Sequence, residues 1–250
     1  DIAASTIAGQ IVDSGTIKGK SHGIVIDSAS EILAGGKTAV VIAGKTLTGG
    51  VTNDGVISGS IGIVVTSAHG VNVFDDGTIT GSGGTAVLFK TGGDEFTLGA
   101  GYTVSGEVIG GGGTLQLGGT GSAGFDLSSV GSAAQYRDFS TFNVVGGTWT
   151  VSGTGGDWNV DRGATLDVAS GGVLSNTNVH AGGTLEVLSG GILDTTSGAT
   201  ASVAGALTVD SGGTAIVSSG GVLETASGGT AIISGALTNN GTLFASGANS

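Results

Sequence analysis

The chain has 250 residues, 54 of them glycine, contains no proline, cysteine or methionine, and carries a formal net charge of −12 at pH 7. The missing cysteine excludes disulfides, zinc–thiolate sites and thiol catalysis. The acidic balance argues against nucleic-acid binding, which needs a basic stripe to neutralise phosphates. With 38% hydrophobic and 10% charged residues, the chain is too apolar for a disordered segment and is typical of many short strands joined by tight turns. No apolar run is long enough for a membrane-spanning helix, so no membrane insertion is expected.

Residues 1–113 contain loosely related segments in which an acidic or Asn turn precedes a glycine and a short strand. "IVDSGTIKGKSHGIVI" (11–26), "VTNDGVISGSIGIVVT" (51–66) and "VFDDGTITGSGGTAVLF" (73–89) share this order. A degenerate copy near 33–42 would bring the step between copies to about 20 residues. We therefore expect degenerate coils of a repeat fold over this range.

The pentapeptide Gly-Gly-Asp-Glu-Phe at 92–96 matches the sequence that names the diguanylate cyclases. That family implies a nucleotide site on a hairpin of an α/β domain, with the acidic pair serving metal and catalysis. Here no helical periodicity flanks the pentapeptide, and a lone lysine lies nearby. We therefore expect a turn between strands, with Asp94 and Glu95 in solvent and Phe96 and Leu98 in the core. An ion held by Asp94 is the alternative.

Residues 114–158 hold six of the eleven aromatic residues and differ from both flanking regions. We expect an irregular coil here, with a short helical turn within 128–139. Burial is favoured for Trp149 and Trp158, and stacking on a sugar is the alternative for the two indoles.

The last third of the chain repeats clearly. "VDRGATLDVASGGVLSNTN" (160–178) is followed by "VHAGGTLEVLSGGILDTTS" (179–197), and a third copy of the same length is "VDSGGTAIVSSGGVLETAS" (209–227). Residues 179–208 and 209–238 also align without gaps at 18 identities over 30 positions. A unit this small cannot bury its apolar face alone, so it must stack on copies of itself.

Parallel stacking also explains the missing proline, which cannot donate to a strand ladder. The sequence therefore predicts an all-β chain: a parallel β-helix, or β-solenoid, of roughly a dozen coils of about 19–22 residues. We expect one domain over 1–250, made of degenerate coils (1–113), an aromatic-rich irregular coil (114–158) and regular repeats (159–250).

The short repeat units of the last third resemble the repeats of AIDA-type autotransporter adhesins of Gram-negative bacteria. "VTNDGVISGS" (51–60) and residues 115–153 are similar to coils of long autotransporter passengers. The resemblance implies a right-handed parallel β-helix that is exported by type V secretion through a separate C-terminal outer-membrane barrel and displayed on the cell surface. Because the chain contains neither signal peptide nor barrel, we expect it to be a passenger fragment, extracellular and anchored at the outer membrane only in the full-length protein.

Motifs that carry chemistry are weak. Gly119, Gly121 and Gly124 fit the spacing G-x-G-x-x-G, but a glycine-rich chain without a following helix makes the match uninformative. The other candidates are the turn acids Asp54, Asp75, Asp76 and Asp94, the recurring acids Glu186, Asp194, Asp210 and Glu224, and the histidines His22, His69 and His180.

We expect the turn acids to be solvated, with ion binding as the alternative, because no tandem calcium-binding nonapeptide is present. We expect the recurring acids to form a surface ladder, and the histidines lie far apart without a nucleophile motif. The sequence therefore predicts no catalytic, metal or cofactor site and no enzyme activity.

The function expected is adhesion, by self-association of identical passengers or by attachment to a host or matrix ligand through a repetitive face. A passive stalk that displays a distal binding module is the second class, and a carbohydrate-active β-helical enzyme is the third. Exposed apolar patches along one face would favour adhesion, and a uniformly polar face would favour the stalk.

Overall fold

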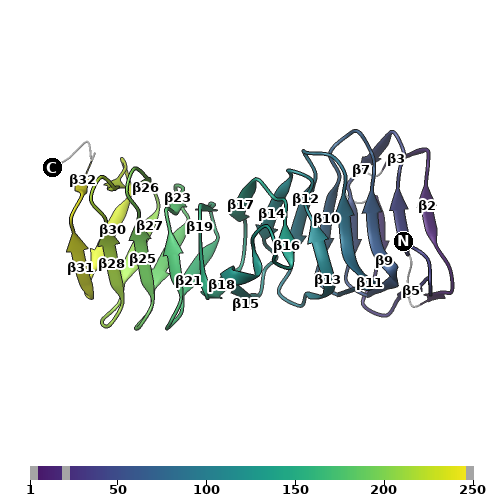
Figure 1. Ribbon diagram of the computed structural model, residues 1–250, viewed down its shortest axis with the longest axis horizontal. Helices are drawn as coiled ribbons and strands as arrows, with labels where there is room; N and C mark the ends of the chain where they lie inside the picture. Colours follow the sequence, from purple (N-terminus) through teal and green to yellow (C-terminus); the bar gives the residue numbers. More distant parts are fainter. Residues whose placement is uncertain (1–4, 19–22, 246–250) are drawn as a thin grey trace. The chain divides into compact units, whose positions relative to one another are not determined.

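The computed structural model describes residues 5–18 and 23–245, and β-strands joined by turns are nearly all of its regular secondary structure (Figure 1). The strands stack in parallel columns and form about 11 turns of a β-solenoid with a repeat of ~22 residues. This confirms the fold class that the sequence predicts. No helix of the described residues has the length and hydropathy that crossing a membrane requires.

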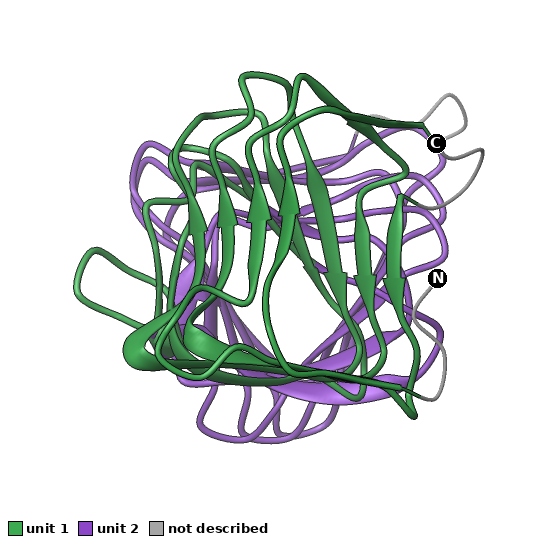
Figure 2. Cartoon of the chain, turned by 90° about the vertical axis from the view of Figure 1, so that its right-hand side faces the viewer, with its two compact units in different colours: residues 1–116, 129–141 green, residues 117–128, 142–250 purple. Residues whose placement is uncertain are grey.

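The chain divides into two compact units, coloured separately in Figure 2. Unit 1 contains residues 1–116 and 129–141, and unit 2 contains residues 117–128 and 142–250. The predicted irregular segment is therefore shared between the units, and the prediction of one domain stays a prediction. Its helical turn is present, as the 3₁₀ helix η1 (Leu127–Ser129), slightly before the expected place.

Unit 1 contains two main columns of parallel strands. The first column consists of β4 (Ile24–Ile26), β8 (Val51–Asn53), β10 (Asn72–Asp75), β12 (Glu95–Leu98) and β14 (Thr114–Leu117). The second consists of β1 (Thr6–Ile7), β5 (Glu31–Leu33), β9 (Val56–Val65), β11 (Thr78–Phe89), β13 (Thr103–Ile109) and β16 (Tyr136–Arg137), with β2 (Ile11–Asp13) pairing β6 (Val40–Ile42), which in turn pairs β9. A separate pair is formed by β3 (Thr16–Lys18) and β7 (Thr46–Thr48).

Unit 2 contains three columns. Column one consists of β17 (Thr141–Val144), β20 (Trp158–Val160), β23 (Asn178–Val179), β26 (Thr200–Val203), β29 (Val222–Thr225) and β32 (Thr242–Ala245). Column two consists of β15 (Ser122–Asp126), β18 (Thr148–Ser152), β21 (Thr165–Val168), β24 (Thr184–Val187), β27 (Ala206–Val209) and β30 (Thr230–Ile233). Column three consists of β19 (Thr154–Gly156), β22 (Val173–Ser175), β25 (Ile192–Thr195), β28 (Thr214–Val217) and β31 (Ala236–Asn239).

Alternation of apolar and polar residues places the core inside each coil, as the sequence predicts. In β24, Leu185 and Val187 are buried and Glu186 between them is half-buried. Because parallel strands pair in register, Leu185 stacks between Leu166 of the preceding coil and Leu207 of the next. Each apolar side chain is therefore covered by its register partners in the two adjacent coils, and the core is continuous along the column.

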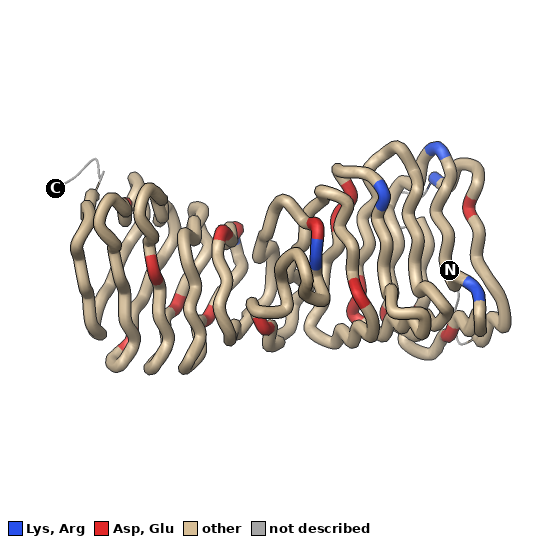
Figure 3. The backbone as a smooth tube through the Cα atoms, viewed as in Figure 1, with Lys and Arg blue, Asp and Glu red and all other residues tan. Residues whose placement is uncertain are grey.

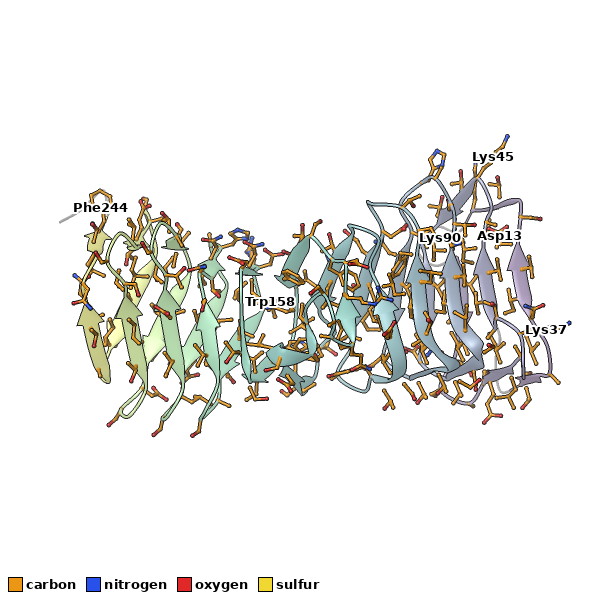
Figure 4. All side chains as sticks on the ribbon, in the orientation of Figure 1. Asp13, Lys37, Lys45, Lys90, Trp158 and Phe244 are labelled. Atoms are coloured by element: carbon orange, nitrogen blue, oxygen red, sulfur yellow. The ribbon has the colours of Figure 1, made fainter. Side chains whose placement is uncertain are left out.

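The aromatic residues of unit 2 are packed as expected. Trp149 and Trp158 have exposed fractions of 0% and 1%, which confirms burial over an open sugar-stacking surface. The ring of Trp158, the residue labelled in Figure 4, lies 5.8 Å from that of Phe125 and 5.4 Å from that of Phe142, centroid to centroid. The Trp149 Nε1–H donates to the Gly146 carbonyl oxygen at 3.1 Å, so its polar end is satisfied without water.

The repeat register in unit 1 differs in part from the sequence alignment. The copies at 51–66 and 73–89 do stack, since Val51 pairs with Val73 and Val56 pairs with Thr78. The copy at 11–26 does not align as expected, because Ile11–Asp13 pairs with Val40–Ile42. Extra strands and turns in the first coils make the number of residues per coil larger than the predicted value of about 20. Sequence similarity limited to a turn does not reveal such insertions.

The regular repeats in unit 2 show a related difference. Thr165 pairs with Thr184, so the first two copies stack directly as successive coils. Thr184 then pairs with Ala206, whereas the aligned residue of the third copy, Thr214, lies on β28 in column three. The aligned residues of the second and third copies therefore do not stack on each other. All three sides of a coil carry a similar short sequence pattern, so the sequence alignment matches residues that lie on different sides.

Candidate functional site

The pentapeptide at 92–96 is a corner between strands of unit 1, with φ of 91° at Gly93 before β12 begins. Phe96 and Leu98 are fully buried, as predicted. The expectation of a solvated Asp94 is wrong, because its side chain is 1% exposed. Asp94 Oδ1 accepts the Val71 N–H at 2.8 Å, so this carboxyl secures the preceding coil.

Burial raises the pKa of Asp94, and the hydrogen bonds from Val71 and from the Thr91 hydroxyl act in the opposite direction. Its role is structural, since it joins two coils through the backbone. Glu95 is half-buried at the start of β12. The corner thus has the geometry of a solenoid turn, in place of the hairpin that the cyclase family implies.

Of the three glycines that match a dinucleotide fingerprint, two precede a strand and the third lies within it. Gly119 has a φ of 82°, and β15 follows from Ser122. A dinucleotide site needs a helix at this point, with its N-terminus directed at the pyrophosphate. Gly119 and Gly121 therefore lie in the turn before β15, and Gly124 is a residue of that strand.

The two described histidines belong to different units. His22 lies outside the described residues. The backbone N–H of His69 donates to Ser67 Oγ at 3.2 Å in the turn between β9 and β10 of unit 1. In unit 2, His180 Nδ1 lies 2.6 Å from Asp161 Oδ1, and both side chains are partly exposed. This contact joins two successive coils at the positions that follow β23 and β20.

The predicted acidic ladder is wrong in its membership. Glu186 lies on β24 in column two, Asp194 on β25 in column three and Glu224 on β29 in column one. Glu186 instead has Asp167 as its register partner in the preceding coil. Glu186, Asp194 and Glu224 therefore lie in three different columns, because repeat-equivalent residues of the sequence fall on different sides of the coil; Asp210 follows β27 in the column of Glu186.

Asp167, Glu186 and Asp210 form an acidic group over three successive coils of unit 2. Burial and the charge of Asp210 raise the pKa of Asp167. Burial, and then the charges of Asp167 and Asp210, raise the pKa of Glu186. Among the described residues, no three His, Cys, Asp or Glu side chains have an arrangement that could hold a metal ion.

Two buried acids of unit 1 were not identified from the sequence as buried. Asp75, expected in solvent, has an exposed fraction of 0%, and Asp13 has one of 7%. Asp54 and Asp76 are exposed, as predicted. The sequence signal shared by Asp13, Asn53 and Asp75 is a position two residues before a glycine, and this spacing specifies a turn without specifying burial.

Polar side chains form rows along the outer faces of unit 2. In column one, Asn159 Nδ2 donates to Asn143 Oδ1 at 3.0 Å, and Asn178 Nδ2 donates to Asn159 Oδ1 at 3.3 Å. In column two, Thr148, Thr165 and Thr184 are register partners in successive coils. These rows present hydrogen-bonding groups at the spacing of neighbouring parallel strands, about 4.8 Å.

Charge differs between the units (Figure 3). Arg162 is the one Lys or Arg in unit 2, and the other six belong to unit 1. The acids of unit 2 are Asp126, Asp157, Asp161, Asp167, Glu186, Asp194, Asp210 and Glu224. In unit 1, Arg137 Nη2 lies 2.9 Å from Glu107 Oε2 in an exposed ion pair.

Large exposed apolar side chains are few in the described chain. In unit 1 they are Val12 and Leu33. In unit 2 they lie on β30, β31 and β32 and include Phe244, labelled in Figure 4. No large apolar side chain of residues 142–229 is fully exposed, and Leu188, Ile192 and Ile216 are half-buried at outer positions.

Comparison with known proteins does not identify the function of the chain. No protein-family model and no curated protein matches the chain. Among solved structures, the chain is similar to the crystal structure of the TibC-catalysed hyper-glycosylated TibA55-350 fragment, with 17% sequence identity over 96% of this chain and 99% of that chain. The TM-score is 0.34, which is too low for the likeness to carry an argument about function.

Proposed function

We propose that the chain is part of an extracellular adhesin passenger that makes contacts through the polar outer faces of its coils. The partners are identical passengers on neighbouring cells, or a host or matrix surface. The observation that carries this proposal is the rows of Asn and Thr side chains in unit 2, repeated from coil to coil. Each contact is weak, and repetition makes the sum effective.

The charge of unit 2 sets a condition on self-association. Unit 2 contains eight acidic residues and one arginine. Two copies of unit 2 that are brought together therefore repel each other. Hydrogen bonds between the rows must exceed this repulsion, and salt screens the repulsion within about 10 Å at 0.1 M. Clumping of displaying cells should therefore increase between low and physiological salt.

A passive stalk is the second candidate, and one observation favours it. The faces over residues 142–229 lack large exposed apolar side chains, and a uniformly polar face is what a spacer requires. A stalk would have the same coils and the same rows of Asn and Thr side chains, but no partner would bind to these rows. The two candidates therefore differ in binding and not in fold.

The discriminating experiment displays the chain on a non-adherent bacterium and measures clumping and binding to matrix proteins. Two matched variants test the faces: Thr184→Lys with Thr208→Lys in column two, and Ser175→Lys with Thr214→Lys in column three. Both variants add two cations at half-buried outer positions. The adhesin proposal expects one pair to reduce contact by several-fold and the other to leave it intact.

Cells that display the folded chain and neither clump nor bind any surface would contradict adhesion and leave the stalk. Equal loss in both variants would show that contact does not depend on a particular face. Far-UV circular dichroism of the purified variants provides the control for folding.

A further inference from the structure

Asn53 and Asp75 form a buried polar pair in unit 1. Asn53 on β8 is the register partner of Asp75 on β10 in the next coil, and both side chains have an exposed fraction of 0%. Asn53 Nδ2 donates to Asp75 Oδ1 at 2.7 Å and to the Thr78 carbonyl oxygen at 3.3 Å. The Gly77 N–H donates to the same carboxyl oxygen at 3.3 Å. Both amide hydrogens of Asn53 are thus engaged, which fixes the orientation of its side chain.

The pair leaves two acceptor atoms without a donor. Asn53 Oδ1 and Asp75 Oδ2 are both buried and have no hydrogen-bond partner. Exchanging the amide nitrogen and oxygen of Asn53 would not help. The amide oxygen would then lie against the Asp75 carboxyl oxygen and the Thr78 carbonyl oxygen, which are both acceptors, and the two present hydrogen bonds would be lost. A single proton on Asp75 Oδ2 supplies a donor that Asn53 Oδ1 can accept. Such a proton, directed at Asn53 Oδ1, would satisfy both atoms in a cyclic acid–amide pair.

We propose that Asp75 is a neutral carboxylic acid in the folded protein and that, with Asn53, it forms a proton-dependent clip between two consecutive coils of unit 1. The clip is intact when the carboxyl is protonated. Ionisation removes the donor and leaves a buried negative charge beside a buried carbonyl oxygen. Unit 1 is then less stable, so the clip makes the stability of this unit sensitive to pH. The inference goes beyond the proposed function and does not depend on it.

The carboxyls around Asp75 act in the direction that this inference requires. Burial raises the pKa of Asp75 from 3.8 to about 7. The hydrogen bonds from Asn53 and Gly77 lower it, and the negative charges of Asp76 and Asp54 raise it further. No cation is among these influences.

Two tyrosines are the other titratable groups coupled to this region. Burial, and then the charges of Tyr102 and Asp75, raise the pKa of Tyr136, which is 3% exposed on β16. Burial also raises the pKa of Tyr102. Both phenols are therefore neutral throughout the pH range in which Asp75 titrates, and neither supplies a charge that would favour ionisation.

The sign of the effect follows from proton binding. The folded state holds the Asp75 proton to a higher pH than the unfolded state does, so the contribution of this group is largest at low pH. It declines as pH rises from about 4 to about 7, and the folding equilibrium constant falls about tenfold per pH unit within that window. Above pH 7 the loss is complete and constant.

The direct test is carbon-13 NMR of the full chain labelled at aspartate, with the Asp75 carboxyl followed from pH 4 to pH 9. We expect a titration midpoint near 7. A midpoint near 4, the ordinary value for an aspartate, would overturn the inference and point to a buried water or cation between the two free acceptors. This measurement uses the native chain and does not depend on any variant folding.

The second test compares Asp75→Asn with the native chain in urea unfolding at several pH values. Asn at this position can donate to Asn53 Oδ1 without ionising. The ratio of the native to the variant folding constant should fall about tenfold per pH unit between pH 4.5 and 6.5. The exposed neighbour provides a matched control, since Asp54→Asn should retain the native slope. Equal slopes for Asp75→Asn and the native chain would refute the clip.

Discussion

The paired glycines at the corners of unit 2 have two different physical roles. At Gly171, the first of its pair, φ is +79° and an added Cβ would meet no atom within 4 Å. At Gly191, the second of its pair, the added Cβ would lie 2.4 Å from the Val168 carbonyl oxygen of the preceding coil, and φ is not positive. The first glycine is thus required by backbone conformation, and the second by the close approach of two coils.

The substitution Gly191→Ala should therefore be the more damaging. Real Cβ atoms do not approach within 3.0 Å of such an atom, so the coils must separate by about 0.6 Å at this corner. The Val168 oxygen also accepts the Leu188 N–H at 3.0 Å, and separation strains that bond. Overpacking costs about 1–3 kcal/mol and a weakened hydrogen bond about 0.5–1.5 kcal/mol, so we expect a loss of about 2–4 kcal/mol.

Gly171 should tolerate more. Alanine in the left-handed region costs about 1–2 kcal/mol, whereas asparagine adopts this conformation at lower cost. Each of the two alanine substitutions also stabilises the folded state by about 0.4–1 kcal/mol, because alanine restricts the unfolded chain more than glycine does. This contribution is the same for both, so the order of destabilisation does not change. The expected order of destabilisation is Gly191→Ala, then Gly171→Ala, then Gly171→Asn.

The assay is urea unfolding followed by tryptophan fluorescence, because both tryptophans belong to unit 2. The midpoint and slope of each variant are compared with those of the native chain. A native-like midpoint for Gly191→Ala, or a greater loss for Gly171→Asn than for Gly191→Ala, would refute the assignment of close approach to the second glycine.

Two further substitutions test the outer faces of unit 2. Asn159→Ala removes the two side-chain hydrogen bonds that link it to its neighbours in the row, and should lower the free energy of unfolding by about 1–2 kcal/mol in the same fluorescence assay. Asp167→Asn removes one charge from the acidic group, and we expect its melting temperature to exceed that of the native chain at pH 8. The pKa of Asp167 is higher in the folded chain than its ordinary value of 3.8, so ionisation of Asp167 destabilises the folded state as pH rises above about 3.8. The gain in melting temperature should therefore shrink toward pH 4, where the native Asp167 is also largely protonated. A gain independent of pH would exclude charge repulsion as its cause.

The sequence predicts the parts of the fold that depend on local pattern. Alternation within four-residue strands places Leu185 and Val187 in the core and Glu186 outside. The same reasoning correctly buries Phe96 and Leu98. These predictions succeed because the side of the sheet that a residue faces is determined by its immediate neighbours in the chain.

The buried acids were missed because their environment comes from another coil. Asp94 is covered by the segment whose Val71 N–H it accepts, 23 residues earlier. Asp75 faces Asn53, 22 residues earlier, at the register position of the neighbouring strand. Both acids look like ordinary turn residues in the sequence. Without the stacking register, the donors that satisfy them cannot be assigned.

The stacking register also decides how the surface is composed. The strongest sequence repeat is longer than one coil of unit 2, because it aligns Thr184 with Thr214, whereas the coils stack Thr184 on Ala206. One step of this repeat, as from Asp194 on β25 to Glu224 on β29, therefore advances the chain by four sides of a three-sided coil, and the two acids lie in different columns. Sequence repetition thus distributes equivalent side chains around unit 2, whereas rows on one face arise only between register partners. A contact face for a partner must therefore be sought along a column, which is why the matched lysine variants are grouped by column.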